Sequence, residues 1–236
     1  MKIYSYLLSL MLFAFVSCKQ KKAETPQGAQ TLTYLALGDS YTIGESVTEL
    51  GRWPHQLAKV LEPIIKQSLL TTIVAKTGWT TNELNQGINE ASLETNYDLI
   101  SLLIGVNNQY RGRSIEEYKL EFESLLKRAV AFKRNDNSPV FVVSIPDYGV
   151  TPFVQNSNRD PIQIASEIDL FNKAAEQICA QYGIPFYNIT GISRTAANDP
   201  NLIAEDGLHP SAQMYRLWVD YFHAAIADKL LANETP

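Results

Sequence analysis

Short apolar runs alternate with amphipathic stretches along most of the chain, and this alternation restricts the possible folds more than any other feature of the sequence. The apolar runs have the length and composition of buried strands. They cover residues 32–37, 69–75, 98–104, 139–144 and 184–188. Parallel strands are joined by helical crossovers, and those helices cover both faces of the sheet. The sequence therefore predicts a three-layer α/β/α sandwich built on a five-stranded parallel sheet.

The stretches between these runs place apolar residues at helical spacing, and several begin with a helix-start signal. Thr80 and Glu83 have the spacing of a capping box, as do Ser114 and Glu117, and Pro54 falls in the first turn of another helix. The predicted helices cover residues 54–67, 80–92, 114–129, 162–182 and 211–226. Because no repeat or second pattern interrupts this order, we expect a single domain over residues 31–236.

The first 30 residues lack this alternation. One lysine precedes an apolar run that ends at Cys18, and residues 18–30 are mostly polar and show no periodicity. The run is shorter than the roughly 20 residues that a membrane-spanning helix needs, which favours a secretory signal peptide over residues 1–17. A cytosolic start or a short membrane anchor is the alternative. Residues 18–30 are expected to form a flexible tether.

Cys18 closes the apolar run in a way that resembles the lipobox of bacterial lipoproteins. The resemblance implies a lipid on Cys18 and a membrane-anchored protein of the cell envelope that faces the periplasm or the exterior. Phe15 departs from the leucine that is usual at its position. Cys179, the other cysteine, lies on the apolar face of a predicted helix, so no intramolecular disulfide is expected. The net charge of −5 argues against nucleic acid as a partner.

Four polar or glycine-rich segments follow predicted strands, where the ligand sites of parallel sheets lie. They are GDSYTIG at 38–44, KTGWTTNEL at 76–84, IGVNNQY at 104–110 and EDGLHPS at 205–211. Ser40 could be a nucleophile, Gly78 could offer a backbone N–H to an anion, and Asn107 could donate its side-chain amide to an oxyanion. Taken singly, each residue could equally be a helix cap or a turn residue.

The fourth segment places Asp206 three residues before His209. Pro210 disfavours the helical region for His209, so the segment must be a loop that leads into the last helix. A tight loop can fold the carboxylate onto the ring, where it accepts the Nδ1 hydrogen and leaves Nε2 free to take a proton from a serine. The alternative is an ordinary loop in which Asp206 binds backbone amides and His209 faces solvent.

In their chain order, the four segments resemble the sequence blocks of the SGNH, or GDSL, hydrolase family over essentially the whole predicted domain. The resemblance implies that Ser40 is the nucleophile, that His209 is the general base and that Asp206 orients it. It also implies an oxyanion hole formed by the backbone N–H groups of Ser40 and Gly78 and by the side chain of Asn107. The fold of the family is a flavodoxin-like three-layer α/β/α sandwich, in agreement with the alternation.

One residue departs from the blocks of the family. Asn108 stands where the third block usually has aspartate, so it must support that loop as a neutral hydrogen-bonding residue. The resemblance implies a serine esterase that works through an acyl-enzyme. No metal or nucleotide cofactor is expected, because the histidines lack zinc-type spacing and residues 38–44 lack the spacing of a phosphate-binding loop.

The substrate is less well defined by the sequence. We expect carboxylic esters of short or medium acyl chains, with acetylated glycans as the next candidate and a non-catalytic envelope binding lipoprotein as the alternative class. Residues 146–161 form a long polar segment that either contacts the substrate or is a simple surface excursion. Residues expected to contact the substrate or to adjoin its pocket are Tyr41, Trp79, Tyr148 and Leu208, together with Trp53, Tyr110 and Phe153.

Overall fold

The computed structural model describes residues 31–232 and contains one five-stranded sheet in the order β2-β1-β3-β4-β5. All neighbouring strands run parallel. The strands are β1 Leu32–Gly38, β2 Leu69–Ala75, β3 Leu99–Leu103, β4 Val140–Val143 and β5 Phe186–Tyr187. Each lies within its predicted run or extends it by one residue, so the predicted sheet is confirmed. The predictions for residues 1–30 lie outside the described part of the chain.

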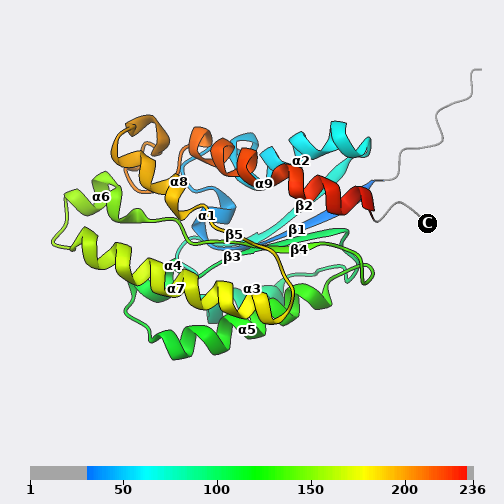
Figure 1. Cartoon of the computed structure of the whole chain (residues 1–236), viewed down its shortest axis with the longest axis horizontal. Coiled ribbons are helices and arrows are strands. Elements are labelled where there is room, and N and C mark those ends of the chain that lie inside the picture. The colour runs from blue at the N-terminus through cyan, green and yellow to red at the C-terminus, as the bar shows by residue number, and fades with distance from the viewer. Residues whose placement is uncertain (1–30, 233–236) are drawn as a thin grey trace, which may run out of the picture.

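Long helices cover both faces of the sheet and coincide with the five predicted helices. They are α2 Trp53–Ile65, α3 Thr81–Glu90, α5 Ile115–Ala131, α7 Pro161–Gln181 and α9 Ala212–Ala232. Helices α2 and α9 pack together on one face, and α3, α5 and α7 lie on the other (Figure 1). This arrangement is the predicted three-layer sandwich.

Helix α3 has the predicted capping box, whereas the second predicted box is half formed. The Thr80 hydroxyl accepts a hydrogen bond from the Glu83 N–H, and the Glu83 carboxylate accepts one from the Thr80 N–H. At the start of α5 the Ser114 hydroxyl accepts from the Glu117 N–H, but the Glu117 carboxylate binds Arg113 instead of the Ser114 N–H. The Arg113 guanidinium thus takes the place of the Ser114 N–H as the donor to Glu117. The sequence spacing of Ser114 and Glu117 does not show this competition.

Short helices follow four of the strands at the carboxyl edge of the sheet. These elements are too short for a helical period to show in the sequence, and none was predicted. They are α1 Ser40–Ile43 after β1, α4 Val106–Tyr110 after β3, α6 Pro152–Gln155 after β4 and α8 Thr190–Arg194 after β5. Single 3₁₀ turns occupy Glu49–Gly51, Tyr148–Val150, Thr195–Ala197 and Pro200–Leu202.

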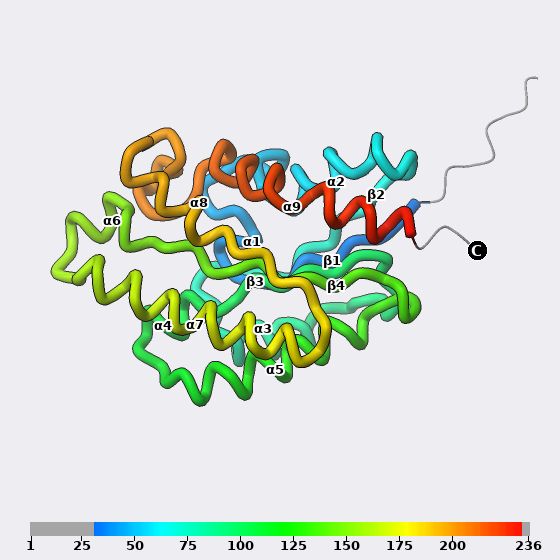
Figure 2. The backbone as a smooth tube through the Cα atoms, in the orientation of Figure 1, coloured from blue at the N-terminus to red at the C-terminus, as the bar shows by residue number. Residues whose placement is uncertain are grey.

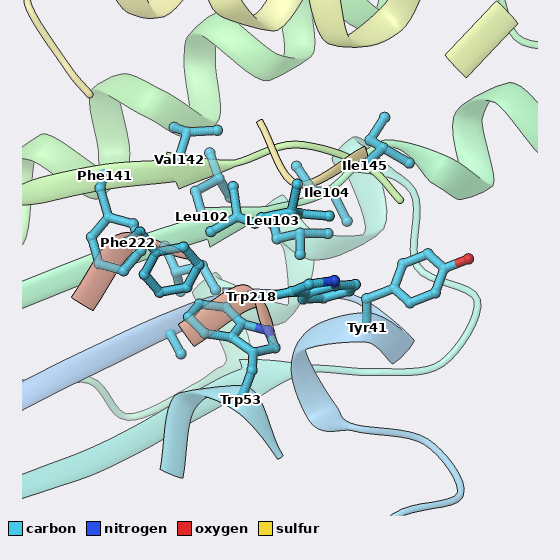
Figure 3. Close-up of a cluster of buried hydrophobic side chains, with 14 of the residues drawn as sticks. Tyr41, Trp53, Leu102, Leu103, Ile104, Phe141, Val142, Ile145, Trp218 and Phe222 are labelled. Carbon is cyan, nitrogen blue, oxygen red and sulfur yellow. The ribbon is translucent and has the colours of Figure 1, made fainter. Parts of the chain in front are cut away.

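Aromatic side chains fill the core between the sheet and the α2–α9 layer. Trp53 is fully buried, and its ring meets the rings of Phe141 and Phe222 edge-on at centroid distances of 6.3 and 6.0 Å (Figure 3). Each ring of this kind removes roughly 150–250 Å² of surface from water, which makes such clusters a main source of folding free energy. The cluster fixes α2 and α9 on the sheet. It also places the ring of Trp53 in the core, although the residue was expected to adjoin the substrate pocket.

The strand order determines where a ligand site can form. From β1 the chain passes to β2 on one side and then crosses to β3 on the other, so the connections diverge between β1 and β3. In open parallel sheets, ligands bind at the carboxyl ends of the strands next to such a point. Helices α1 and α4 begin there, and both ends of the described chain lie at the far end of the molecule from α6 (Figure 2).

Candidate active site

Ser40 is the first residue of α1 and lies in a sharp turn between strand and helix. A Cβ atom at Gly38 would fall 2.4 Å from the Leu103 carbonyl oxygen, so the close approach of β1 and β3 requires glycine. The Asp39 carboxylate caps α1 by accepting the Tyr41 N–H at 3.0 Å. Asp39 is itself buried, and that burial raises its pKa to about 7 against the lowering effect of backbone N–H groups. The turn holds Ser40 at the edge of the sheet with only 5% of its surface exposed.

Asp206 folds back onto the His209 ring, and both sequence-based alternatives for this loop are partly realised. The Oδ2 atom of Asp206 lies 2.6 Å from His209 Nδ1, while Oδ1 accepts the N–H groups of Leu208 and His209, each at 2.9 Å. Gly207 allows this tight loop with a φ of 71°. His209 is buried and does not face solvent. A proton on Nδ1, held by the carboxylate, leaves Nε2 as the basic nitrogen.

Hydrogen bonds keep Asp206 ionised. Partial burial opposes ionisation, but the backbone and ring of His209, the Leu208 N–H and the Ser46 hydroxyl together lower the pKa of Asp206 to about 2. The carboxylate is therefore negative at any pH at which an ester hydrolase is assayed. It is available to stabilise a positively charged imidazole during a reaction.

Ser40 and His209 line one cavity of about 160 Å³ at the carboxyl edge of the sheet. Gly78 and Asn107 line the same cavity, so the predicted nucleophile, base and oxyanion donors meet at one place. No hydrogen bond joins Ser40 Oγ to His209 within the described chain, and such contacts commonly tighten only when substrate binds. The remaining lining residues are mostly apolar: Tyr41, Thr77, Val106, Tyr110, Tyr148, Phe153 and Leu208.

The two predicted oxyanion donors that follow β2 and β3 are held by hydrogen bonds to each other's loops. Asn107 Nδ2 donates to the Trp79 carbonyl oxygen at 3.0 Å, which fixes the amide and leaves its second N–H for a ligand. The Gly78 carbonyl oxygen accepts from Arg111 at 2.6 Å, and Arg111 also binds both carboxylate oxygens of Glu83 at 3.1 Å. Donors fixed in this way need little reorganisation when charge develops on a bound oxygen.

Asn108 supports this loop through both ends of its amide. It is fully buried, its Oδ1 accepts the Thr81 N–H at 3.0 Å, and its Nδ2 donates to the Thr81 hydroxyl at 2.7 Å. That hydroxyl in turn donates to the Glu121 carboxylate. A neutral amide is required at position 108, because the Thr81 hydroxyl has only one hydrogen and donates it to Glu121. A carboxylate at position 108 would find no donor in that hydroxyl. The residue that departs from the family blocks thus supplies a donor that aspartate lacks when ionised.

Asn108→Asp is expected to lower the free energy of unfolding at neutral pH by about 1–3 kcal/mol, the cost of a buried polar group without its partner. Protonation of the new carboxyl group at position 108 restores a donor. The loss of unfolding free energy should therefore shrink as the pH falls toward the ordinary range for a carboxyl group. Urea unfolding at several pH values measures both effects. Asn108→Asp in a Glu121→Gln background is the matched control, because Thr81 can then donate to residue 108 and accept from residue 121. Equal losses in the two backgrounds would contradict the proposed hydrogen-bond chain.

Three aromatic rings form the wall of the cavity next to the segment that follows β4. The ring of Tyr110 lies 6.1 Å from that of Tyr148 and 6.4 Å from that of Phe153, centroid to centroid. The Phe153 N–H donates to the Gly207 carbonyl oxygen at 2.9 Å, which ties this wall to the loop of Asp206 and His209. The segment predicted as a long polar loop therefore contains α6 and a 3₁₀ turn, and it packs against the site.

Two tryptophans expected near the pocket lie elsewhere in the described structure. Trp53 belongs to the core, and the Trp79 ring lies against Gly87 on α3, where a Cβ atom would meet it at 2.0 Å. Only the backbone carbonyl of Trp79 reaches the site, through Asn107. Sequence reasoning also missed Thr77 and Val106, each of which directly precedes a predicted donor in the chain. Their position next to those donors was the only available signal.

The two remaining histidines have structural partners. His55 Nδ1 lies 2.8 Å from the Glu49 carbonyl oxygen, and His223 Nδ1 lies 3.1 Å from the Val219 carbonyl oxygen. Across residues 31–232, no group of three or more His, Cys, Asp or Glu side chains has a geometry that could hold a metal ion.

Comparison with known proteins assigns the chain to a family. Residues 36–217 match the GDSL-like lipase/acylhydrolase family. A lipase from a goat rumen metagenome is similar in structure, with a TM-score of 0.68 and 17% identity over 82% of this chain and 97% of that one. An acetylxylan esterase from Geobacillus stearothermophilus gives a TM-score of 0.64 at 17% identity, over 83% and 94% of the two chains.

A psychrotrophic esterase from Pseudoalteromonas gives a TM-score of 0.59 at 18% identity, over 86% of this chain and 99% of that one. No curated protein matches the chain by sequence. At these identities the solved structures support the fold alone, whereas the family match covers most of the chain, including every predicted catalytic residue. The chain therefore belongs to the GDSL-like lipase/acylhydrolase family, and is a hydrolase of the SGNH esterase/lipase type.

Proposed function

We propose that the chain is a serine esterase that hydrolyses carboxylic esters of short or medium acyl chains through an acyl-enzyme on Ser40. The observation that carries the proposal is the shared cavity, which brings Ser40 together with the His209–Asp206 pair and the two further oxyanion donors, Gly78 and Asn107. These groups come from four loops that are far apart in sequence. Their convergence at one edge of the sheet supports acyl transfer as the common chemistry.

The reaction follows from the positions of these groups. Ser40 Oγ attacks the ester carbonyl carbon while His209 Nε2 takes the hydroxyl proton, and the carbonyl electrons move onto the oxygen. The backbone N–H groups of Ser40 and Gly78 and the Asn107 amide stabilise that oxyanion. Collapse breaks the bond to the alcohol oxygen, which receives the proton from His209. Water then attacks the acyl-enzyme with the same base, and the products are a carboxylic acid and free Ser40.

The apolar lining of the cavity supports an acyl group of limited length. Side chains of Tyr110, Tyr148, Phe153, Val106 and Leu208 surround it, and its volume is about 160 Å³. Apolar walls with a few convergent polar groups are typical of sites for small organic ligands. A long acyl chain would have to displace an aromatic side chain or leave the cavity.

Phe153→Ala is expected to shift the preference toward longer acyl chains, because it removes one wall of the cavity. The ratio of kcat/KM for p-nitrophenyl decanoate to that for p-nitrophenyl acetate should rise roughly tenfold, the discrimination that one or two methylene groups give in an apolar pocket. A p-nitrophenyl ester series on both proteins measures the ratio. Phe132→Ala, at the end of α5, is the matched control and should leave the ratio unchanged. An unaltered profile in Phe153→Ala would place the acyl group elsewhere.

Acetylated glycans are the second candidate substrate. The small cavity and the similarity to an acetylxylan esterase favour this alternative. Acetate release from acetylated xylan or peptidoglycan, compared with hydrolysis of p-nitrophenyl butyrate, separates the two candidates. No hydrolysis of any ester by the intact protein would instead favour a binding protein that keeps the fold.

We further propose that residues 1–17 are a signal peptide and that Cys18 carries a lipid that anchors the protein to a membrane of the cell envelope. Among residues 31–232, no helix is both long enough and apolar enough to cross a bilayer. Strand β1 begins at the edge of the sheet opposite the cavity, so an anchor before Leu32 would join the domain at the end away from the site. Incorporation of labelled palmitate that disappears in Cys18→Ala is the expected result. Absent or unchanged labelling would reject the anchor.

A further inference from the structure

Ser46 has an unusual backbone conformation close to the candidate catalytic residues. Its φ of 63° is positive, and Lys66, at the end of α2, is the other non-glycine residue with positive φ in the described chain. A side chain raises the energy of this region, so such residues persist where the surrounding structure holds them, often at functional sites. Ser46 lies on the turn after α1 and is exposed, so burial of its side chain does not explain the conformation.

The Ser46 hydroxyl donates a hydrogen bond of 2.7 Å to Asp206 Oδ2. The same oxygen lies 2.6 Å from His209 Nδ1, while Oδ1 accepts two backbone N–H groups. The carboxylate thus has four hydrogen-bond partners, which fill its acceptor sites and leave it one orientation. Ser46 follows α1, the helix that begins with Ser40. The hydrogen bond therefore links the segment of the nucleophile directly to the segment of the base, 160 residues away.

We propose that Ser46 is a positioning residue, whose hydroxyl fixes the Asp206 carboxylate so that the His209 ring presents Nε2 to Ser40. The inference rests on the proposed esterase function. The positive backbone angle of Ser46 is what brings its hydroxyl to the carboxylate. Ser46 acts through Asp206, and it makes no contact with the cavity.

Loss of the hydroxyl has two physical consequences. The carboxylate gains rotational freedom, so the imidazole spends less time in the productive orientation. The free acceptor site on Oδ2 also makes the carboxylate a stronger partner for a protonated imidazole, so the ring holds its proton to higher pH. Other titratable or charged groups around the loop are Tyr41, beside the His209 ring, and buried Tyr215, which interacts with the charge of Asp206. Asp39, Glu45 and Arg52 lie around Tyr215 in turn. None of these groups changes in the variants below, so a shift in pH dependence reports the hydroxyl.

Two variants at position 46 separate the hydrogen bond from the backbone strain. Ser46→Gly relieves the positive φ but also loses the hydrogen bond to the charged carboxylate, so the two effects on stability should largely cancel. Its kcat should fall by about threefold to tenfold, the factor that one hydrogen bond contributes. The acid limb of its kcat/KM profile should move to higher pH. Ser46→Thr keeps the hydroxyl but places a β-branched side chain in the strained region. It should unfold at lower urea and keep the wild-type pH profile.

Lys66→Gly is the matched control, because it relieves the same backbone strain far from the site. It should gain stability with unchanged kinetics. A Ser46→Gly protein with wild-type kcat and an unmoved acid limb would overturn the positioning role, while Ser40→Ala measured beside it tests the proposed function separately. If no ester is hydrolysed, the low-field NMR signal of the His209 Nδ1 proton still decides the question. It should move in Ser46→Gly and stay in Lys66→Gly, and an unmoved signal would refute the proposal.

Discussion

Ser40→Ala is expected to lower kcat for ester hydrolysis by at least about 10⁴-fold, because it removes the oxygen that forms the acyl-enzyme. The change deletes one atom and keeps the Ser40 backbone N–H in the predicted oxyanion hole. The Asp39 cap on α1 does not involve the serine side chain, so the turn should survive. KM should change little, since the cavity walls are untouched. Any hydrolysis that remains faster than the uncatalysed reaction in water would come from the oxyanion donors and substrate binding alone.

Initial rates on p-nitrophenyl butyrate measure this effect, and a urea unfolding curve confirms that the variant is folded. Ser166→Ala is the matched control, because its hydroxyl lies on the exposed surface of α7 and bonds only to the Ile162 carbonyl oxygen. It should retain wild-type activity. Substantial turnover by Ser40→Ala would remove Ser40 from the role of nucleophile and leave the proposed acyl-enzyme without an attachment point.

His209→Ala is expected to lower kcat by about 10⁴- to 10⁶-fold, and Asp206→Asn by a smaller factor. Alanine at 209 leaves no group to take the serine proton. With asparagine at position 206, the His209 imidazole remains in the site. The asparagine can still accept hydrogen bonds from the Leu208 and His209 N–H groups with its carbonyl oxygen. Its NH₂ group then faces His209 Nδ1, which favours the tautomer with the proton on Nε2 and accounts for a large but incomplete loss.

The pH dependence separates these two variants further. Because the pKa of Asp206 is about 2, its carboxylate stays negative through the range of the assay. Buried Asp39, whose pKa is raised to about 7, titrates in that range in all three proteins. The part of the wild-type acid limb in kcat/KM that reports protonation of the base is therefore the part that vanishes in His209→Ala. A profile of kcat/KM against pH for all three proteins measures this. A larger loss in Asp206→Asn than in His209→Ala would contradict the assigned roles.

The strands and long helices could be predicted because each has a pattern of its own. Strand β3 is buried on both faces, and the 17 residues of α5 from Ile115 to Ala131 give more than four turns of amphipathic spacing. Helices α1 and α4 have only four and five residues, so no period can show in them. Strand β5 is reduced to Phe186–Tyr187, because β4 pairs with it over only two residues at the edge of the sheet.

The site could be predicted in part, since the residues proposed for chemistry follow strands directly or precede the last helix. The residues that support them depend on contacts between distant segments. Ser46 meets Asp206 across 160 positions, and Asn108 meets Thr81 across 27, so neither role is visible in local spacing. For the aromatic residues, position in the sequence did not predict which way the ring points. Trp79 adjoins a predicted donor, yet its ring points to Gly87, because neighbours in sequence can face opposite sides.

Covalent labelling with an alkyl fluorophosphonate tests whether Ser40 is a nucleophile that His209 activates. The reagent phosphorus is attacked by an activated hydroxyl oxygen and fluoride leaves, so the adduct marks the nucleophile that the His209 base activates. Mass spectrometry of the intact protein and its peptides should find a single adduct on Ser40, none in Ser40→Ala and much slower labelling in His209→Ala. An adduct on another residue with Ser40 unmodified would rule out Ser40 as the nucleophile, and equal labelling rates with and without His209 would rule out His209 as its base.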